Sequence, residues 1–170
     1  MIISRIFGEI LIKVENTEVA KYIKSNGRVS IKEGNGKILE LITPSRWNEE
    51  VDSSNGIFLL FDLFQIRSVT EQFSEVSLDI VEYATKATIY HSPVNRVLQK
   101  CPKVDGNIKF AMIRNDFWNK VLFAFGQPVI YQEKEDGNAD FETKERFPLF
   151  GPDVKEMFLS PDGDVKIIKA

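Results

Sequence analysis

The sequence predicts a single α/β domain built on one mixed β-sheet, and three observations point to this fold class. First, segments with the pattern of strands alternate with segments that have the pattern of helices. Second, Gly34-Asn35-Gly36 and Pro161-Asp162-Gly163 each separate two strand-like segments, as hairpin turns do. Third, the 170 residues fit one domain and contain no proline- or serine-rich linker. Together these features predict a twisted mixed sheet with flanking helices.

The first 56 residues predict a strand, a helix, a hairpin and a loop. Apolar residues alternate in part along the first strand, and Asn26-Gly27 is typical of a helix C-terminus. The glycines of Gly34-Asn35-Gly36 adopt positive φ angles easily, as a tight turn requires. The expected elements are a strand at Arg5–Val14, a helix from Asn16 or Thr17 with Val19, Ala20 and Ile23 inward, hairpin strands at Arg28–Glu33 and Lys37–Ile42, and a loop at Thr43–Gly56.

Residues 57–170 continue the alternation. Ile57–Asp62 is an unbroken apolar segment, typical of a central strand that is buried on both faces. Ser77 and Asn115 are expected to cap two helices, and Gly126 is expected to end the second. The other expected elements are a helical face at Ile66, Val69 and Phe73, a second at Leu78, Val81 and Ala84, a short helix at Val94–Lys100, a helix with Phe117, Val121, Leu122 and Phe125 inward, and strands at Ala87–His91, Asn107–Ile113, Pro128–Tyr131, Met157–Leu159 and Val165–Ile168.

The composition argues against several classes of protein. The longest apolar runs, such as Ile57–Phe61, are far shorter than the ~20 residues of a membrane span, and the first residues lack an export pattern. A single cysteine, Cys101, cannot close an internal disulfide, and one cysteine with one histidine cannot form a Cys/His zinc site. We therefore expect a cytoplasmic protein with no membrane partner and no metal.

The charge distribution gives no support for nucleic-acid binding. The net charge is −3, from 22 basic and 25 acidic residues, whereas binding to a phosphate backbone usually requires a basic excess. Six acids and three bases lie between Glu133 and Arg146, so this segment carries the whole net charge. Asp136 and Asp140 lack the spacing of an EF-hand, so a solvated acidic loop is the favoured interpretation.

Six segments of the chain resemble the YrdC-like domain, the family of threonylcarbamoyl-adenylate synthases that act in tRNA modification. The resemblance lies mainly in core elements and covers about two thirds of the chain, best over residues 57–170, whereas residues 1–56 diverge. It implies a YrdC-like fold for one domain of residues 1–170. The matching segments are Ile57–Asp62, Val76–Val81, Thr85–Tyr90, Asp105–Ile108, Phe125–Ile130 and Asp162–Ile168, with a weaker match at Asn26–Ile31.

The chemical motifs of that family have no counterpart here. Glu33-Gly34-Asn35-Gly36 stands where the family has Pro-Thr-Asp-Thr, and Glu49-Glu50-Val51 stands where it has a phosphate-binding Lys-x-Arg pair. The arginine of its Gly-(Ile/Val)-Arg-Ile strand falls near Ala111, and Tyr131–Glu135 replaces its Ser-x-Ser-Ala-Asn motif. A triphosphate site needs cations and oriented donors, and each exposed like-charge pair at 4 Å opposes binding by ~1 kcal/mol. We therefore expect no catalytic residues and a binding or interaction module.

An active synthase is the alternative, one that uses ATP, threonine and bicarbonate through displaced residues. Three residues carry an implied nucleotide site. Lys86 and Thr88 lie in the segment that resembles the family's Lys-Pro-Leu-Thr stretch, although Ala87 replaces the proline and the segment is one residue shorter. Arg114 ends a predicted strand, from where it can reach a phosphate. The resemblance thus implies nucleotide binding at Lys86 and Thr88, and Arg114 is a further candidate because of its place at the strand end. A strand start with a solvated lysine is the alternative for Lys86 and Thr88. ATP and magnesium are the expected ligands if the cleft is retained.

The only notable basic cluster consists of Lys21, Lys24, Arg28 and Lys32, interleaved with Tyr22. Such a cluster can bind RNA phosphates and stack a base, although a solvated amphipathic surface is the favoured interpretation. A protein partner, including a second copy of the chain, is the third alternative, and it predicts a large exposed apolar patch.

The remaining candidate residues have structural explanations. His91 has no evident partner in the sequence and is expected to end a strand, while Cys101 lacks a neighbour that would activate its thiol. The aromatic residues around Trp118 are expected in the core, with a partner surface predicted only if Trp118 and Phe123 face outward.

Overall fold

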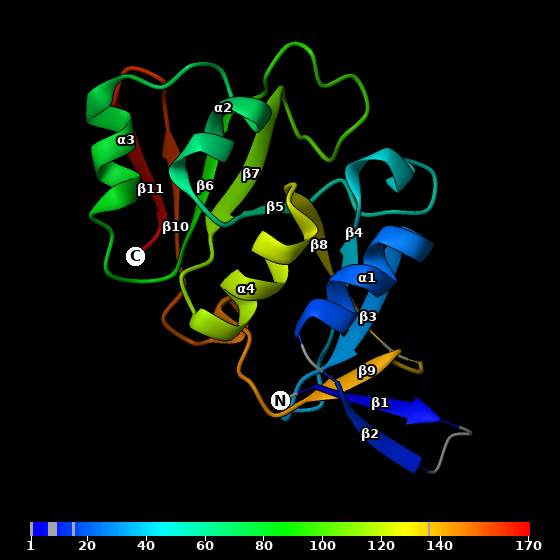
Figure 1. Cartoon of the computed structure of the whole chain (residues 1–170). Coiled ribbons are helices and arrows are strands. Elements are labelled where there is room, and N and C mark those ends of the chain that lie inside the picture. Colours follow the sequence, from blue (N-terminus) through cyan, green and yellow to red (C-terminus); the bar gives the residue numbers. More distant parts are fainter. Residues whose placement is uncertain (1, 7–9, 15, 136) are drawn as a thin grey trace.

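The computed structural model describes residues 2–6, 10–14, 16–135 and 137–170, with side chains described from residue 16 onward. The described part forms one eleven-stranded mixed sheet with helices packed on it (Figure 1), so the predicted fold class is confirmed. The strands are β1 (Ile2–Ile6), β2 (Ile10–Val14), β3 (Arg28–Lys32), β4 (Ile38–Ile42), β5 (Ile57–Leu60), β6 (Thr88–Pro93), β7 (Asn107–Met112), β8 (Val129–Lys134), β9 (Phe141–Thr143), β10 (Lys155–Leu159) and β11 (Val165–Lys169). The helices are α1 (Asn16–Asn26), α2 (Ile66–Val69), α3 (Glu75–Glu82) and α4 (Asp116–Phe125), with short 3-10 helices η1 (Pro44–Arg46), η2 (Leu63–Gln65) and η3 (Pro148–Phe150).

The strand order is β11-β10-β6-β7-β5-β8-β4-β3-β9-β1-β2. Three neighbouring pairs are parallel, namely β10–β6, β7–β5 and β3–β9, and the other pairs are antiparallel. The antiparallel pairs include the predicted hairpin of β3 and β4, in which the N–H of Glu33 donates to the carbonyl of Lys37.

Two apolar cores lie on opposite faces of the sheet, and β5 contributes to both. Ile57 and Leu59 belong to the core beneath α1 and α4, whereas Phe58 and Leu60 belong to the core beneath α2 and α3. Because successive side chains of a strand point to opposite faces, a strand covered on both sides must be apolar throughout. The prediction of a fully buried strand here is confirmed, since all four residues of β5 are buried.

The capping residues and apolar periodicity in the sequence predicted helices α1 and α4 correctly. In α1 the residues Val19, Ala20 and Ile23 are buried, and Gly27 follows with a φ of +77°. In α4 the side chain of Asn115 accepts a hydrogen bond from the N–H of Trp118, and Gly126 ends the helix in the left-handed conformation. Both ends of α4 are therefore as predicted.

Two local predictions were wrong. The expected strand Arg5–Val14 is divided between β1 and β2, which pair antiparallel with Ile6 opposite Ile10, and residues 7–9 lie outside the described part. The cap of α3 is Ser74, whose hydroxyl accepts from the N–H of Ser77. Ser77 is instead buried, and its hydroxyl oxygen lies within hydrogen-bond distance of the carbonyls of Ser160 and Pro161.

Two further predictions differ from the structure, one for a local reason and one because of long-range strand pairing. Residues 94–100 form turns rather than a helix, with the Asn95 carboxamide accepting from the N–H of Val97, a local bond that competes with helix formation. The acidic segment contains β9, which pairs with β1 and β3. Among the described residues, no helix has the length and apolar character needed to cross a membrane.

Candidate nucleotide-binding site

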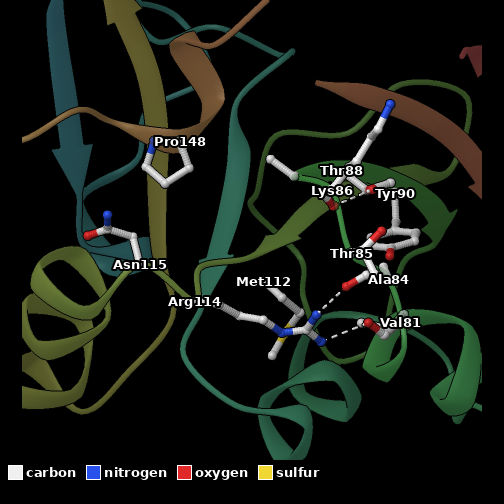
Figure 2. Close-up of a pocket in the computed structure, with 11 residues that line it drawn as sticks. Val81, Ala84, Thr85, Lys86, Thr88, Tyr90, Met112, Arg114, Asn115 and Pro148 are labelled. Atoms are coloured by element: carbon white, nitrogen blue, oxygen red, sulfur yellow. Dashed lines mark hydrogen bonds between the residues drawn. The ribbon is translucent and has the colours of Figure 1, made fainter. Parts of the chain in front are cut away.

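A cavity of about 300 Å³ lies where the end of α3, the start of β6, the end of β7 and the start of α4 meet η3. Figure 2 shows its two sides, with Asn115 and Pro148 facing a group formed by Lys86, Thr88 and Tyr90, and with Arg114 between them. The lining residues are Val81, Ala84, Thr85, Lys86, Ala87, Thr88, Tyr90, Met112, Arg114, Asn115 and Pro148.

Arg114 is fixed by the end of α3. Its Nη1 donates to the carbonyl of Ala84 and its Nη2 to the carbonyl of Val81, each at 2.8 Å (Figure 2). The last carbonyls of a helix lack partners within the helix and carry partial negative charge, so a guanidinium stabilises them. Because a guanidinium has five N–H groups, Arg114 retains donors for a ligand.

Lys86 and Thr88 form the opposite side of the cavity. The hydroxyl of buried Thr88 donates to the carbonyl of Lys86 at 2.9 Å, which holds the turn that precedes β6. The ammonium group of Lys86 is exposed and makes no ion pair with any residue in the described part of the chain. It is therefore available to an anionic ligand.

Tyr90 makes the cavity wall rigid. Its ring is 1% exposed and stacks on Phe110 with a centroid distance of 5.1 Å. Burial raises the pKa of Tyr90 above the usual value for tyrosine, although a hydrogen bond with Thr88 and the charge of Arg114 oppose this shift. The phenol is thus neutral at physiological pH, and the cations of the cavity face no phenolate.

The η3 side of the cavity is held by a buried acid. Glu33 is 7% exposed, and its Oε2 accepts from the N–H of Phe147 at 2.7 Å. Trp118 Nε1 donates to the carbonyl of Arg146 at 2.8 Å, which fastens the same segment to α4. These contacts place Pro148 against the cavity.

The structure brings together the three residues for which a nucleotide site was predicted. Lys86, Thr88 and Arg114 all line this cavity, and nucleotide binding by them stays a prediction. Tyr90, Asn115 and Pro148 also line the cavity, and no feature of the sequence placed them there. Asn115 was identified only as a helix cap, and Pro148 lies far along the chain with no motif to mark it.

The four basic residues predicted to bind RNA do not form one surface. Lys21 and Lys24 lie on α1, which covers the face of the sheet where Val29 of β3 is buried. Strand alternation places Arg28 and Lys32 on the opposite face. The Arg28 guanidinium is moreover engaged by Asp52, at 2.6 and 2.8 Å.

The other candidate residues have local partners. His91 Nε2 lies 2.5 Å from a carboxylate oxygen of Glu156 on β10, a contact that the sequence did not reveal. Burial raises the pKa of the Cys101 thiol, which keeps it in the less reactive protonated form. Asp140 accepts hydrogen bonds from Tyr22 and Ser30, and Asp136 lies outside the described residues. No group of metal-ligating side chains occurs among the residues described.

The expected core position of Trp118 is confirmed at 2% exposed, whereas Phe123 is 68% exposed and packs edge-on against Phe61. A partner surface was predicted only if Trp118 and Phe123 both face outward, so α4 does not meet that condition.

Comparisons with known proteins identify the fold and nothing finer. No family model matches the chain, and no curated protein matches its sequence. Among solved structures, the crystal structure of E. coli YciO superposes with a TM-score of 0.62 over 92% of this chain and 90% of that chain, at 10% sequence identity. An identity this low shows the fold alone. The chain therefore has the YrdC-like fold of YciO, as its core segments predicted.

Proposed function

We propose that this protein is a binding module that holds a nucleotide through its phosphate in the cavity between Lys86 and Arg114, and that it has lost synthase activity. The observation that carries the proposal is that two cationic residues from separate segments, Lys86 and Arg114, line one cavity. An ammonium group and the remaining guanidinium N–H groups form charge-assisted hydrogen bonds with phosphate oxygens. The volume of about 300 Å³ lies at the lower end of the ~300–1,000 Å³ range of ligand sites, which favours a mononucleotide.

Loss of synthesis is supported by what replaces the family's motifs. Glu33-Gly34-Asn35-Gly36 is a hairpin turn in which the N–H of Gly36 donates to the carbonyl of Glu33. The Glu33 carboxylate is committed to Phe147, and Glu49 and Glu50 lie in a hollow beside Arg46 and Lys100. None of these positions supplies a cation in place of the family's Lys-x-Arg pair.

We expect AMP to raise the unfolding midpoint of the wild-type protein by several degrees. Ligand at 100 times its Kd adds about 2.7 kcal/mol, and each kcal/mol moves the midpoint by roughly 2–4 °C for a domain of this size. Lys86→Glu is expected to remove the shift, because a carboxylate then faces the phosphate. Lys103→Glu makes the same charge change at an exposed lysine outside the cavity and should preserve the shift. The measurement is thermal unfolding at several concentrations of AMP and magnesium-ATP.

Equal loss in both variants, or no shift in the wild type at millimolar ligand, would refute binding at this cavity. An assay of threonine-dependent pyrophosphate release tests the second half of the proposal. We expect no such release, and its detection would show that synthase activity is retained.

Protein association is a second candidate function, and one observation favours it. Large apolar side chains are exposed on α3, at the residue that follows it and on the edge strand β11, namely Val76, Tyr83, Val165 and Ile167, each between 45% and 74% exposed. Val165 and Ile167 pair with Leu159 and Met157 of the core beneath α3, so they lie on the same face as that helix. Contiguous exposed apolar patches often mark protein interfaces.

If this patch joins two copies of the chain, Ile167→Lys should shift the protein from dimer to monomer. Sedimentation velocity at increasing protein concentration measures this, and Val97→Lys, at a residue 78% exposed outside the patch, is the matched control. A wild-type protein that stays monomeric at high concentration would rule out self-association.

A further inference from the structure

A second, larger hollow lies at the opposite end of β6 from Lys86 and Thr88. Its volume is about 760 Å³, and its lining includes Arg67 at the end of α2 and Arg96 in the turn after β6. The six residues of β6 separate the two cavities by about 20 Å, at roughly 3.3 Å per residue. This hollow is therefore separate from the nucleotide cavity.

Hydrogen bonds fix the two arginine-bearing segments to each other. The backbone N–H of Asn95 donates to the carbonyl of Val69 at 3.0 Å, and Asn95 Nδ2 donates to the carbonyl of Arg67 at 2.7 Å. The N–H of Glu71 donates to the carbonyl of Pro93 at 3.1 Å. The backbones that carry Arg67 and Arg96 are thus held in a set relative position before any ligand arrives.

Both guanidinium groups are available. Neither Arg67 nor Arg96 makes a side-chain hydrogen bond or ion pair with any residue that the structure describes, including Glu71 in the same lining. This distinguishes them from Arg28 and Arg114, whose guanidinium groups are held by protein acceptors.

Apart from the Glu71 carboxylate, the lining adds little competition for these donors. The buried Thr70 hydroxyl lies within hydrogen-bond distance of the carbonyls of Ile66 and Glu71, so its one hydrogen has a backbone acceptor. Gln72 is exposed and offers an amide donor. Two guanidinium forks and an amide are a donor set that matches an oxyanion with several acceptor oxygens.

We propose that this hollow binds a phosphate-bearing ligand through Arg67 and Arg96. Phosphate fits because each guanidinium can donate two parallel hydrogen bonds to one phosphate group. The volume exceeds that of a lone phosphate, so the ligand carries further polar groups, and the carboxylate of Glu71 can accept from hydroxyl or amino groups of that ligand. A small phosphorylated molecule and an RNA backbone share this chemistry.

The test uses pyrophosphate as the probe, with the full-length protein. In ¹H–¹⁵N correlation spectra, pyrophosphate should shift the amide signals of residues 67–72 and 95–97, and Arg67→Gln and Arg96→Gln should each weaken binding at least tenfold. Arg46→Gln is the matched control, because Arg46 also makes no ion pair within the described part of the chain but lies in a separate hollow with Glu49 and Glu50. Lys86→Glu should leave these shifts unchanged, which separates this site from the nucleotide cavity.

Titration with a short single-stranded RNA distinguishes a small phosphorylated ligand from an RNA backbone. RNA binding that falls steeply with salt and is displaced by pyrophosphate supports a backbone ligand, whereas pyrophosphate binding without RNA binding supports a small phosphorylated ligand. Absence of shifts at these residues up to millimolar pyrophosphate, or equal affinity in both arginine variants and the wild type, would overturn the proposal.

Discussion

Trp118→Ala is expected to lower the free energy of unfolding by about 3–5 kcal/mol, the usual cost of removing a large aromatic side chain from a core. Trp118 is 2% exposed, and its ring lies edge-on to Phe117 and Phe147 at centroid distances of 5.1 and 5.3 Å. Its Nε1 is also the donor to the carbonyl of Arg146. The substitution therefore leaves both a cavity and an acceptor without its protein partner. Urea unfolding at pH 7 measures the loss.

Two controls separate the causes of that loss. Trp118→Phe keeps much of the ring volume but removes the indole N–H, so we expect an intermediate loss. Phe123→Ala truncates an aromatic residue on the same helix, but Phe123 is 68% exposed and should cost about 1 kcal/mol or less. Comparable losses in Trp118→Ala and Phe123→Ala would contradict the assignment of Trp118 as the anchor of α4.

A domain stability of about 5–15 kcal/mol makes this loss functionally relevant. The hydrogen bond from Trp118 fastens the segment that leads to Pro148, and Pro148 lines the nucleotide cavity. We therefore expect Trp118→Phe to weaken AMP binding even though Trp118 does not line the cavity.

The sequence could predict those elements whose signals are local. The hairpin at Gly34-Asn35-Gly36, the caps of α4 and the burial of Ile57–Leu60 depend on turn residues and apolar periodicity, which adjacent residues display. The short strand β9 could not be predicted, because Phe141–Thr143 lies within an acidic segment and is defined by its pairing with β1 and β3.

The site was predictable only in part, for a similar reason. The resemblance indicated Lys86 and Thr88, and the predicted strand end indicated Arg114; the fold brings all three to one cavity. Nothing in the sequence indicated that Arg114 would cap α3 or that Glu33 would hold the segment before η3. Arg114 is 33 positions from its acceptor Val81, and Glu33 is 114 positions from its donor Phe147. The hollow of Arg67 and Arg96 was missed because isolated arginines carry no motif.

Asp52→Asn is expected to destabilise the protein by about 2 kcal/mol at pH 7, within the range for hydrogen bonds to charged groups. The Asp52 side chain is 2% exposed and accepts two hydrogen bonds from Arg28, at 2.6 and 2.8 Å, and one from the N–H of Asn48 at 2.7 Å. An amide in this place offers one acceptor oxygen in place of two and leaves the Arg28 guanidinium with Glu40 at 3.5 Å as its remaining acid.

The loss of stability in Asp52→Asn is expected to depend on pH. Burial alone would raise the pKa of Asp52, but the hydrogen bonds from Arg28 and Asn48 and the charge of Arg28 outweigh burial and lower it below its usual value. A carboxyl group with a lowered folded-state pKa stabilises the protein above its unfolded pKa of ~3.9, and this stabilisation is lost as the pH falls below that value. The difference between wild type and Asp52→Asn should therefore be constant from pH 7 to 5 and narrow below pH 4.

Thermal unfolding between pH 3 and 7 checks this, with Asp79→Asn as the control at an exposed position of α3. We expect the control to lie within about 0.5 kcal/mol of wild type at every pH. A difference for Asp52→Asn that persists unchanged at pH 3 would show that the loss comes from packing rather than from the ion pair.

The location of this ion pair explains why it matters for the fold. Asp52 belongs to the loop between β4 and β5, and Arg28 belongs to β3, so their contact fastens the loop to the face of β3 that lies opposite α1. Gln132 of β8 extends the connection, accepting from the N–H of Ser53 at 2.9 Å and donating to Glu40 at 2.7 Å. Because these groups share one network, Arg28→Gln and Asp52→Asn should cost less together than the sum of their separate effects, and strict additivity in the double-mutant cycle would contradict that coupling.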